Sequence, residues 1–277
     1  MPLKICCIID DDLIWGLPVW SATMPKLISF GYEVNKIWVL PPKLGKFKGI
    51  NIYLWYLKNL GIICFIKLCL FSIVRKFSII ISGIKFKDYP SNFKKLASIY
   101  SIEFQKIYSL KDEHFLREIN DLNVDIMVIM TSHKIPKNIL NKPNIGTINK
   151  HASNLPENKG MFPFIWAALN NNDQAVSFHL VEEKIDEGDL LFQKIFLNRK
   201  FSSMMKFYDY VFARYPSDLI TAIENLLSKS FLKKDTNKID NYNSLPGKKE
   251  MRIFFKKGFK VVKFRDIISQ LRIPLYL

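Results

Sequence analysis

The segments DIMVIM at residues 125–130 and IGTINKH at residues 145–151 decide the fold of this chain. Each contains a run of apolar and β-branched residues of the length expected for a buried strand. Residues 136–140, which lie between them and begin with proline, predict a helical turn. A strand, a crossover and a second strand in this order are typical of a parallel sheet in an α/β protein.

The same alternation continues on both sides of this unit. Further strands are predicted over residues 4–9, 34–40, 99–107, 176–182 and 190–196, and helices over residues 17–30, 114–122, 162–169 and 202–227. Gly31 ends the first helix, Asp112 caps the second, and Pro216 interrupts the last. We therefore predict an α/β fold, with a Rossmann-like, mostly parallel sheet and a small C-terminal appendage.

The net charge of +16 is concentrated in two segments. Residues 43–95 hold eleven Lys and Arg against one acid, and residues 229–277 hold thirteen against four. Such segments attract phosphates, nucleic acid or anionic lipid, and a Lys-rich surface that only keeps the protein dissolved is the alternative. We predict a catalytic domain at residues 1–200, with a basic, hydrophobic insertion at about 43–95. A helical linker and a small C-terminal region follow at residues 201–277.

Hydrophobic residues make up 49% of the 277 residues, which excludes a disordered chain. The cysteines Cys6, Cys7, Cys64 and Cys69 lack the spacing of metal ligands, so we expect no metal site. They are expected to be free, buried thiols in a reducing compartment. The apolar run at residues 4–9 is too short for a signal peptide and ends in acids, which favours a cytoplasmic protein.

Residues 52–86 form an apolar, aromatic segment that Lys58, Lys67, Arg75 and Lys76 interrupt. A membrane span needs roughly 18 or more apolar residues with few charges, so a span is the least favoured interpretation. A pair of helices buried against the domain or in a dimer interface is favoured. A basic amphipathic element that lies on a membrane surface is the alternative.

Polar side chains gather where the strand at residues 145–151 ends. Asn149 and His151 are two residues apart, so they project from one face of the strand, near the carboxyl edge where open α/β sheets bind ligands. A polar turn after the following strand carries Asp186. An imidazole can accept the proton that an attacking amine loses, an amide N–H can stabilise an oxyanion, and a carboxylate favours the charged imidazole. These three groups suit acyl transfer to an amine.

The order of five landmarks resembles that of the folate-dependent formyltransferase family. The landmarks are Asn149-x-His151, the loop Ser153-Asn-Leu-Pro156, Lys159-Gly160, the helix with Pro163 and Trp166, and His179 followed by Asp186-Glu-Gly188-Asp189. The family includes glycinamide ribonucleotide, methionyl-tRNA and sugar-nucleotide N-formyltransferases. The resemblance covers about residues 125–197, does not extend to residues 43–110, and is closest to the sugar-nucleotide enzymes.

The resemblance implies an N-formyltransferase that uses 10-formyltetrahydrofolate. It assigns His151 as general base, Asn149 as oxyanion stabiliser and Asp186 as the carboxylate that tunes His151. The implied folate-binding residues are His133, Lys134, Ile135, Glu182, Glu183, Lys184 and Ile185. The implied substrate-binding residues are Ser153, Lys159, Gly160 and Trp166. The family's usual residues are replaced by Ala152, Asn154, Lys159, Ala175 and Glu187, which leaves the shapes of the folate and amine pockets open.

Three classes of amine acceptor compete. Transfer-RNA formyltransferases carry a C-terminal barrel, for which the chain after residue 227 is short, and the purine-pathway enzyme lacks the hydrophobic insertion. We therefore expect a nucleotide-linked amino sugar of the kind used in lipopolysaccharide biosynthesis, no nucleic-acid partner, and a homodimer. Methionyl-tRNA, or a lipid-linked amino sugar formylated at the inner face of the membrane, is the alternative acceptor. A non-catalytic binding module is disfavoured because the catalytic residues are intact.

Overall fold

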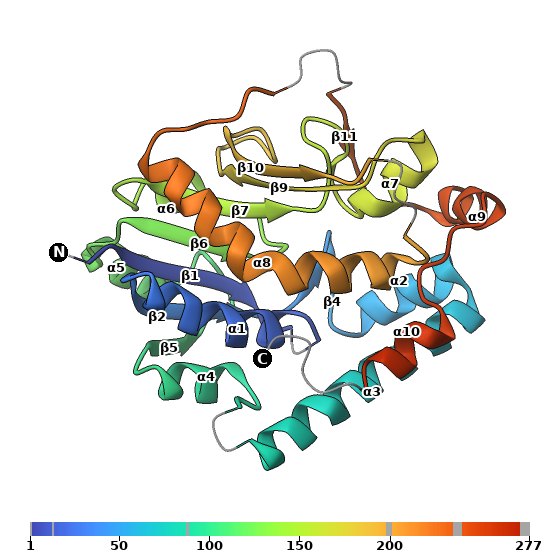
Figure 1. Ribbon diagram of the computed structural model, residues 1–277, viewed down its shortest axis with the longest axis horizontal. Coiled ribbons are helices and arrows are strands. Elements are labelled where there is room, and N and C mark those ends of the chain that lie inside the picture. The colour runs from blue at the N-terminus through green and yellow to red at the C-terminus, as the bar shows by residue number, and fades with distance from the viewer. Residues whose placement is uncertain (1, 13, 87–88, 198–200, 235–239, 272–277) are drawn as a thin grey trace.

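A seven-stranded sheet runs through the molecule in the order β10-β9-β7-β6-β1-β2-β5 (Figure 1). Its strands are β1 (Lys4–Asp10), β2 (Glu33–Leu40), β5 (Glu103–Lys106), β6 (Ile126–Met130), β7 (Gly146–His151), β9 (Ala175–Leu180) and β10 (Leu190–Ile195). The five neighbouring strands β7, β6, β1, β2 and β5 are parallel to one another, whereas β9 is antiparallel to both of its neighbours, β7 and β10. The computed structural model describes residues 2–12, 14–86, 89–197, 201–234 and 240–271. The predicted α/β fold with a mostly parallel sheet is confirmed.

Helices cover both faces of this sheet. They are α1 (Gly16–Ser29), α5 (Glu113–Asp121), α6 (Lys137–Leu140) and α8 (Met204–Leu227). Ile5, Cys7 and Ile9 of β1 belong to the core that α1 and α8 close, whereas Cys6 and Ile8 belong to the core that α5 and α6 close. A strand that is buried on both faces must be apolar at successive positions, as β1 is.

The helix α8 is continuous, and the interruption predicted at Pro216 is wrong. Pro216 lies buried inside the helix, between the buried side chains of Tyr215 and Leu219. A proline inside a helix costs about 3 kcal/mol, because it removes one backbone hydrogen bond and crowds the preceding turn. The long buried face of α8 against α1, β9 and β10 outweighs this cost.

Two short stretches differ from the predicted pattern. The antiparallel pair β3 (Lys43–Leu44) and β4 (Phe47–Lys48) forms just before the hydrophobic insertion. The strand predicted over residues 99–107 begins only at Glu103, because α4 (Phe93–Ile99) precedes it. Asn92 caps α4 by accepting the backbone N–H of Lys95, and Ser101 turns the chain with a φ of +55°.

The C-terminal elements pack against earlier parts of the chain. They are β11 (Tyr242–Asn243), α9 (Lys248–Lys256) and α10 (Phe264–Ser269). The strand β11 pairs with β8 (Lys159–Gly160), and α9 packs on α7 (Pro163–Asn170). Residues distant in sequence therefore brace the loop that follows His151.

The hydrophobic insertion forms two helices, α2 (Ile50–Leu60) and α3 (Ile62–Lys85). α2 packs on β4, α3 and α9, and α3 packs on α10 along the lower part of the molecule (Figure 1). Within the described residues, no helix combines the length and the low polarity needed to cross a bilayer. All four cysteines are free thiols, but only Cys6 and Cys7 are buried; Cys64 and Cys69 are half-buried because they lie on this surface helix.

Candidate active site

The predicted catalytic residues meet at the carboxyl edge of the sheet. Asn149 and His151 lie at the end of β7, and His179 on β9 is paired with Asn149 in the strand register. Asp186 reaches the same place from the turn between β9 and β10. Two backbone segments that are separate in sequence therefore bring an amide, two imidazoles and a carboxylate together.

The ring of His151 lies between two hydrogen-bond acceptors. Its Nε2 is 3.0 Å from the backbone oxygen of Asn158, and because a carbonyl only accepts, Nε2 donates in the neutral ring. Its Nδ1 lies 3.5 Å from Oδ2 of Asp186 and is the nitrogen that takes up a second proton. Burial lowers the pKa of His151 below its ordinary value of 6.5, against the opposing effect of Asp186. The resting ring is therefore neutral at pH 7 and can act as a base.

Asp186 is held in its charged form. Burial by itself raises the pKa of this carboxyl, but His151, His179 and the backbone N–H of Gly160 together hold it well below its usual range. The Gly160 nitrogen lies 2.9 Å from Oδ2 of Asp186 and fixes its direction. A charged carboxylate at this position stabilises a proton on His151.

His179 was not assigned a catalytic role from the sequence, although it is one of the landmarks of the family resemblance. Its Nδ1 lies 2.6 Å from the backbone oxygen of Leu180, so Nδ1 carries the ring proton. Its Nε2 lies 3.4 Å from Nδ2 of Asn149 and 3.5 Å from Oδ1 of Asp186. In the neutral ring Nε2 accepts from the amide, and when the ring is protonated it faces the carboxylate with an N–H. His179 therefore orients the side chain of Asn149, and leaves the second N–H of the amide for another acceptor.

The loop that carries Asn158 and Gly160 supports both ends of the site. Asn158 is buried with a φ of +57°, and its side-chain oxygen accepts hydrogen bonds from Asn170 and Asn243. Gly160 has a φ of +93°, and a Cβ there would lie 2.3 Å from the backbone oxygen of Asn243. No side chain other than hydrogen fits. Asn and Gly are both residues that favour turns, but no local pattern shows that the carbonyl of Asn158 faces His151.

The four predicted substrate-binding residues have different surroundings. Gly160 contacts Asp186, as described above. Lys159 is almost fully buried and forms ion pairs with Glu187 at 3.0 Å and Asp240 at 2.5 Å, so its charge is already neutralised. Ser153 is buried, and its backbone oxygen accepts from Ser177. Trp166 donates from Nε1 to the backbone oxygen of Ser244, 2.9 Å away, in the C-terminal segment.

The first predicted folate-binding segment follows β6. His133 contacts the backbone oxygen of Pro41 at 2.9 Å, Lys134 is exposed, and Ile135 lies in the core beside α6. Asp10, at the end of β1, accepts from Thr131 and from Ser132 at 2.5–2.9 Å and so anchors this loop. Burial raises the pKa of Asp10. Asp10 was not singled out from the sequence as a site residue.

The second predicted folate-binding segment is the exposed turn formed by Glu182, Glu183, Lys184 and Ile185. Glu183 lies 3.1 Å from Lys137 at the start of α6, which brings the turn beside the loop after β6. Both partners are well exposed, so the ion pair adds little stability. The ion pair nevertheless shows that the two predicted folate-binding segments lie at the same end of the sheet.

Lys150 points to the opposite face of β7, among aromatic side chains. Its Nζ lies 4.2 Å from the ring centre of Phe212 and 5.9 Å from that of Tyr208, and Trp15 stacks on Phe212. Burial lowers the pKa of Lys150 to about 7. No sequence signal distinguishes this lysine from the many others in the chain.

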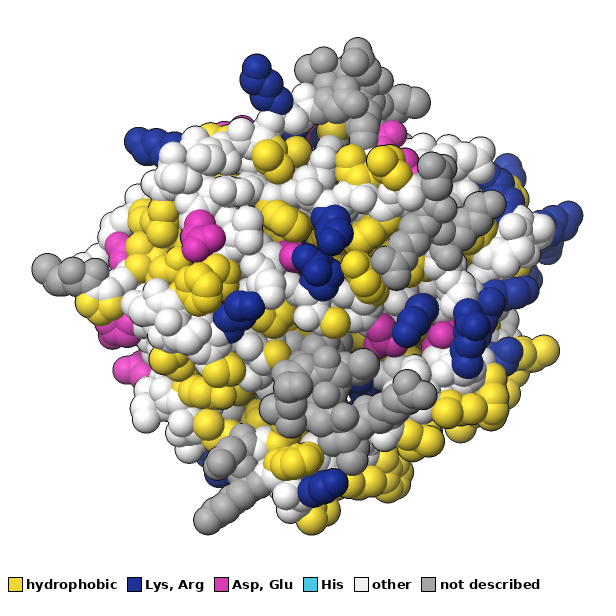
Figure 2. All heavy atoms as spheres, viewed as in Figure 1, with side chains coloured by type: hydrophobic (Ala, Val, Ile, Leu, Met, Phe, Trp, Pro, Cys, Tyr) yellow, Lys and Arg dark blue, Asp and Glu magenta, His cyan; other side chains and the backbone are white. Residues whose placement is uncertain are grey.

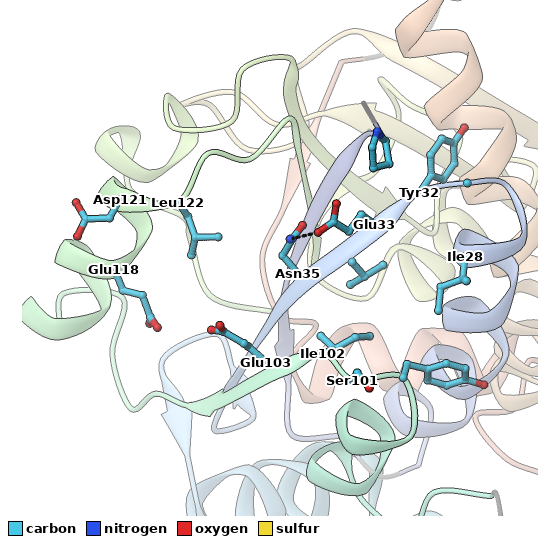
Figure 3. Close-up of a pocket in the computed structure, with 14 residues that line it drawn as sticks. Ile28, Tyr32, Glu33, Asn35, Ser101, Ile102, Glu103, Glu118, Asp121 and Leu122 are labelled. Atoms are coloured by element: carbon cyan, nitrogen blue, oxygen red, sulfur yellow. Dashed lines mark hydrogen bonds between the residues drawn. The ribbon is translucent and has the colours of Figure 1, made fainter.

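An open cavity of about 790 Å³ lies at the other end of the sheet (Figure 3). The acidic side chains of Glu33, Glu103, Glu118 and Asp121 surround it, near the amino ends of β2 and β5. It is therefore separate from the site at the carboxyl edge. In the described part of the chain, no three His, Cys, Asp or Glu side chains are arranged to hold a metal ion.

Part of the chain is similar to a known protein family. Residues 77–200, which include Asn149, His151 and Asp186, match the profile of the Formyl transferase family. A methionyl-tRNA formyltransferase of Flavobacterium johnsoniae is 33% identical over 102 residues, 36% of this chain and 32% of that protein. One of Parabacteroides distasonis is 32% identical over 106 residues, 38% of this chain and 33% of that protein. The chain thus spans about a third of the length of these relatives.

Solved structures match the fold over most of the chain. A sugar N-formyltransferase of a Shewanella species has a TM-score of 0.54 and 17% identity, and the match covers 95% of this chain and 90% of that one. A glycinamide ribonucleotide transformylase of Symbiobacterium toebii has a TM-score of 0.55 and 11% identity, with coverage of 87% and 95%. The sequence match and the shared fold agree. Residues 77–200 of the chain are therefore similar to the formyl transferase family, within a fold that the solved formyltransferases share.

Proposed function

We propose that this protein transfers a formyl group from 10-formyltetrahydrofolate to the amine of a nucleotide-linked amino sugar. The observation that carries the proposal is the neutral His151 with its Nδ1 facing the charged Asp186, beside an Asn149 amide that His179 orients. A base paired with a fixed carboxylate and an N–H donor are what formyl transfer to an amine requires.

Each group has a role in the transfer. 10-Formyltetrahydrofolate, when bound, would supply the formyl group and leave as tetrahydrofolate. His151 accepts the proton that the attacking amine loses and holds it at Nδ1, where Asp186 stabilises the positive charge. The same proton would pass to the folate nitrogen as its bond to the formyl carbon breaks, which leaves His151 neutral again. The free N–H of Asn149 donates to the oxygen that becomes negative at the formyl carbon.

The folate assignment rests on the two segments that meet at this end of the sheet. The turn at residues 182–185 is exposed, and the loop after β6 is anchored by Asp10, so both can present backbone groups to a pterin ring. We assign His133, Lys134, Ile135, Glu182, Glu183, Lys184 and Ile185 to this function. The side chain of Ile135 is in the core, so that residue would contribute through its backbone.

The sugar acceptor is supported by the named relatives. WlaRD, described as a sugar 3N-formyl transferase, has the same fold with a TM-score of 0.54 and was solved with dTDP and 5-N-formyl-THF. The N-formyltransferase of Helicobacter canadensis was solved with folinic acid and dTDP-3-aminofucose. Lys159 is already paired with two carboxylates, so Gly160, Ser153 and Trp166 would shape the acceptor pocket, and Lys159 would support the loop. A cytoplasmic homodimer belongs to the same proposal.

A second acceptor, methionyl-tRNA, is favoured by the sequence relatives, all of which match over about a third of their length. The experiment is a formyl-transfer assay with 10-formyltetrahydrofolate, following the release of tetrahydrofolate. Acceptors are nucleotide-linked 3-amino and 4-amino sugars, methionyl-tRNA and a lipid-linked amino sugar. Faster transfer to methionyl-tRNA or to the lipid-linked sugar than to every nucleotide sugar would show that the proposed acceptor is wrong, but folate-dependent formyl transfer would still hold. No transfer to any of them, with the folded protein, would reject the chemistry.

A further inference from the structure

The outward face of α3 is apolar along its whole length of 24 residues. Nine large side chains on it are between 44% and 80% exposed: Ile62, Ile63, Ile66, Leu70, Ile73, Phe77, Ile80, Ile81 and Ile84. Their spacing of three or four residues places them in a single stripe on the helix. We call these nine residues the α3 stripe.

The inward face of the same helix is less apolar than the outward one. Its buried residues are Phe71, Arg75, Ser78, Ile79 and Ser82. Arg75 donates to the side chain of Gln270 at 2.7 Å and to the backbone oxygen of Ile14 at 3.1 Å. A surface helix of a globular protein normally buries its apolar stripe and exposes its polar one. In α3 the buried face mixes apolar and polar residues, and the nine residues of the α3 stripe remain outside, so the stripe contributes little to the stability of the fold.

The apolar surface continues beyond α3. On α2, Ile50, Tyr53, Leu54 and Leu57 are exposed, and on and beside α10, which packs against α3, so are Phe264, Ile268 and Leu271. Hydrophobic side chains gather along the lower right edge of the molecule, where α2 and α3 lie (Figures 1 and 2). Contiguous apolar surface of this extent marks a contact site, because isolated soluble proteins rarely expose it.

Positive charges border the stripe on both sides. At 3.6 residues per turn, Lys67 and Lys85 lie along one edge of the stripe and Lys76 along the other. Lys76, Lys85 and Lys58 on α2 are exposed, and Lys67 is half-buried. Residues 34–86 contain no Asp or Glu. Lysines at the margins of an apolar stripe can keep their ammonium groups in the headgroup region while the stripe enters the acyl chains.

We propose that the α3 stripe binds the surface of an anionic lipid bilayer, with α3 parallel to the membrane plane. Anionic headgroups complement the bordering lysines, and the acyl chains take up the stripe. A second copy of the chain fits less well, because a two-fold contact through this face would bring the lysines of both copies together without any acid from the segment. The observations on the page therefore favour a lipid surface.

The geometry also connects this surface to the catalytic site. Trp55 of α2 stacks on Phe162, with ring centres 5.5 Å apart and planes 15° apart. Phe162 follows Gly160 by two residues, and Gly160 donates to Asp186. A protein bound through α2 and α3 would thus hold its catalytic edge close to the bilayer.

The test is co-sedimentation of the full chain with vesicles of phosphatidylcholine alone, and with vesicles that also contain phosphatidylglycerol. We expect binding that needs phosphatidylglycerol and falls as salt rises. The triple variant Ile73→Ser, Phe77→Ser, Ile80→Ser should reduce the bound fraction about tenfold or more, because exposed side chains that enter lipid are lost. Tyr108→Ser with Leu197→Ser, at apolar positions elsewhere that are even more exposed, is the control and should bind as the unmodified chain does.

Charge is tested separately with Lys67→Glu, Lys76→Glu and Lys85→Glu, against Lys111→Glu, Lys142→Glu and Lys229→Glu. The two sets change the net charge of the protein equally, so they differ only in position. The first set, which borders the α3 stripe, should abolish binding, and the second set should weaken it only slightly. Sedimentation velocity without lipid reports on self-association. The proposal is overturned if the chain fails to bind phosphatidylglycerol vesicles. It is equally overturned if the serine variant changes a dimer into a monomer and leaves vesicle binding unaltered. None of these measurements depends on formyl transfer.

Discussion

The backbone nitrogen of Gly160 lies 2.9 Å from Oδ2 of Asp186 and points the carboxylate at His151. Gly160 pairs with Asn243 of β11, so a strand from the C-terminal region holds the loop that directs the carboxylate of Asp186. The site therefore depends on contacts between residues that are more than eighty positions apart.

Gly160→Ala should both destabilise the protein and remove activity. The new Cβ would lie 2.3 Å from the backbone oxygen of Asn243, at a φ of +93°, so β8 and β11 must separate. We expect turnover to fall about a hundredfold, as for a lost catalytic group. Gly258→Ala is the matched control, because Gly258 has a φ of +85° and open space around it. It should lower stability by about 1–2 kcal/mol through backbone strain alone, with turnover unchanged. Equal effects of the two substitutions on turnover would contradict the role of Gly160.

His151→Asn and Asp186→Asn should each reduce turnover about a hundredfold or more. The pH profile distinguishes their roles. His151 acts when neutral, and its pKa is lowered below 6.5, so the rate should fall on the acid side at a midpoint below 6.5. In Asp186→Asn the stabilising charge is lost, so the residual activity should show its acid limb at a still lower pH. A limb that stays in place, or moves upward, would exclude Asp186 as the partner of His151.

His179→Gln tests the orientation of Asn149. We expect kcat to fall about tenfold, with little change in the KM of the folate, because the amide is misplaced only where charge develops. A double-mutant cycle with Asn149→Ala is the measurement. If His179 acts through Asn149, adding His179→Gln to Asn149→Ala should have almost no further effect on kcat. Fully additive losses would show that His179 acts independently.

Lys150→Met should stabilise the protein near pH 7 and below. The pKa of Lys150 is lowered to about 7 in the folded chain, whereas an unfolded chain has the ordinary value of 10.5. The unfolded state therefore binds more protons between these values, so the unmodified protein gains stability as pH rises through that range. At pH 6.5 the variant should melt about 2–4 °C higher, a shift that corresponds to roughly 1 kcal/mol in a chain of this size. The difference should shrink as pH rises towards 10, and a difference that grows would contradict burial of the charge.

Much of this architecture was predictable from local sequence. The strands β1, β2, β6 and β7 are short apolar runs, as the buried centre of a parallel sheet requires. Their predicted bounds agree with the observed bounds to within about one residue. The N-cap at Asp112, which accepts from Phe115, was also visible in the sequence. Asn149 and His151 could be placed together because their spacing matches the two-residue repeat of a strand.

Long-range contacts decided what the sequence did not show. The continuity of α8 through Pro216 depends on the sheet that it covers, and no local propensity includes that burial. Lys159 is neutralised by Glu187 and Asp240, which lie 28 and 81 positions away, so its sequence neighbours could not indicate that it is unavailable to a phosphate. Asn158 faces His151 only because its backbone adopts a φ of +57° in a loop that β11 braces.

The sequence by itself therefore determined the strands of the sheet, the placement of Asn149 and His151 on one face of a strand, and the amphipathic composition of the insertion, because each follows from residue type at short, regular spacing. Only the tertiary structure decided the direction of Asp186, the part of His179 in holding Asn149, and which face of α3 meets solvent. A helical period shows that one face is apolar, but the direction of that face depends on what the rest of the chain packs against it. In this protein the chain packs against the side of α3 that carries Phe71, Arg75, Ser78, Ile79 and Ser82, and leaves the α3 stripe outside.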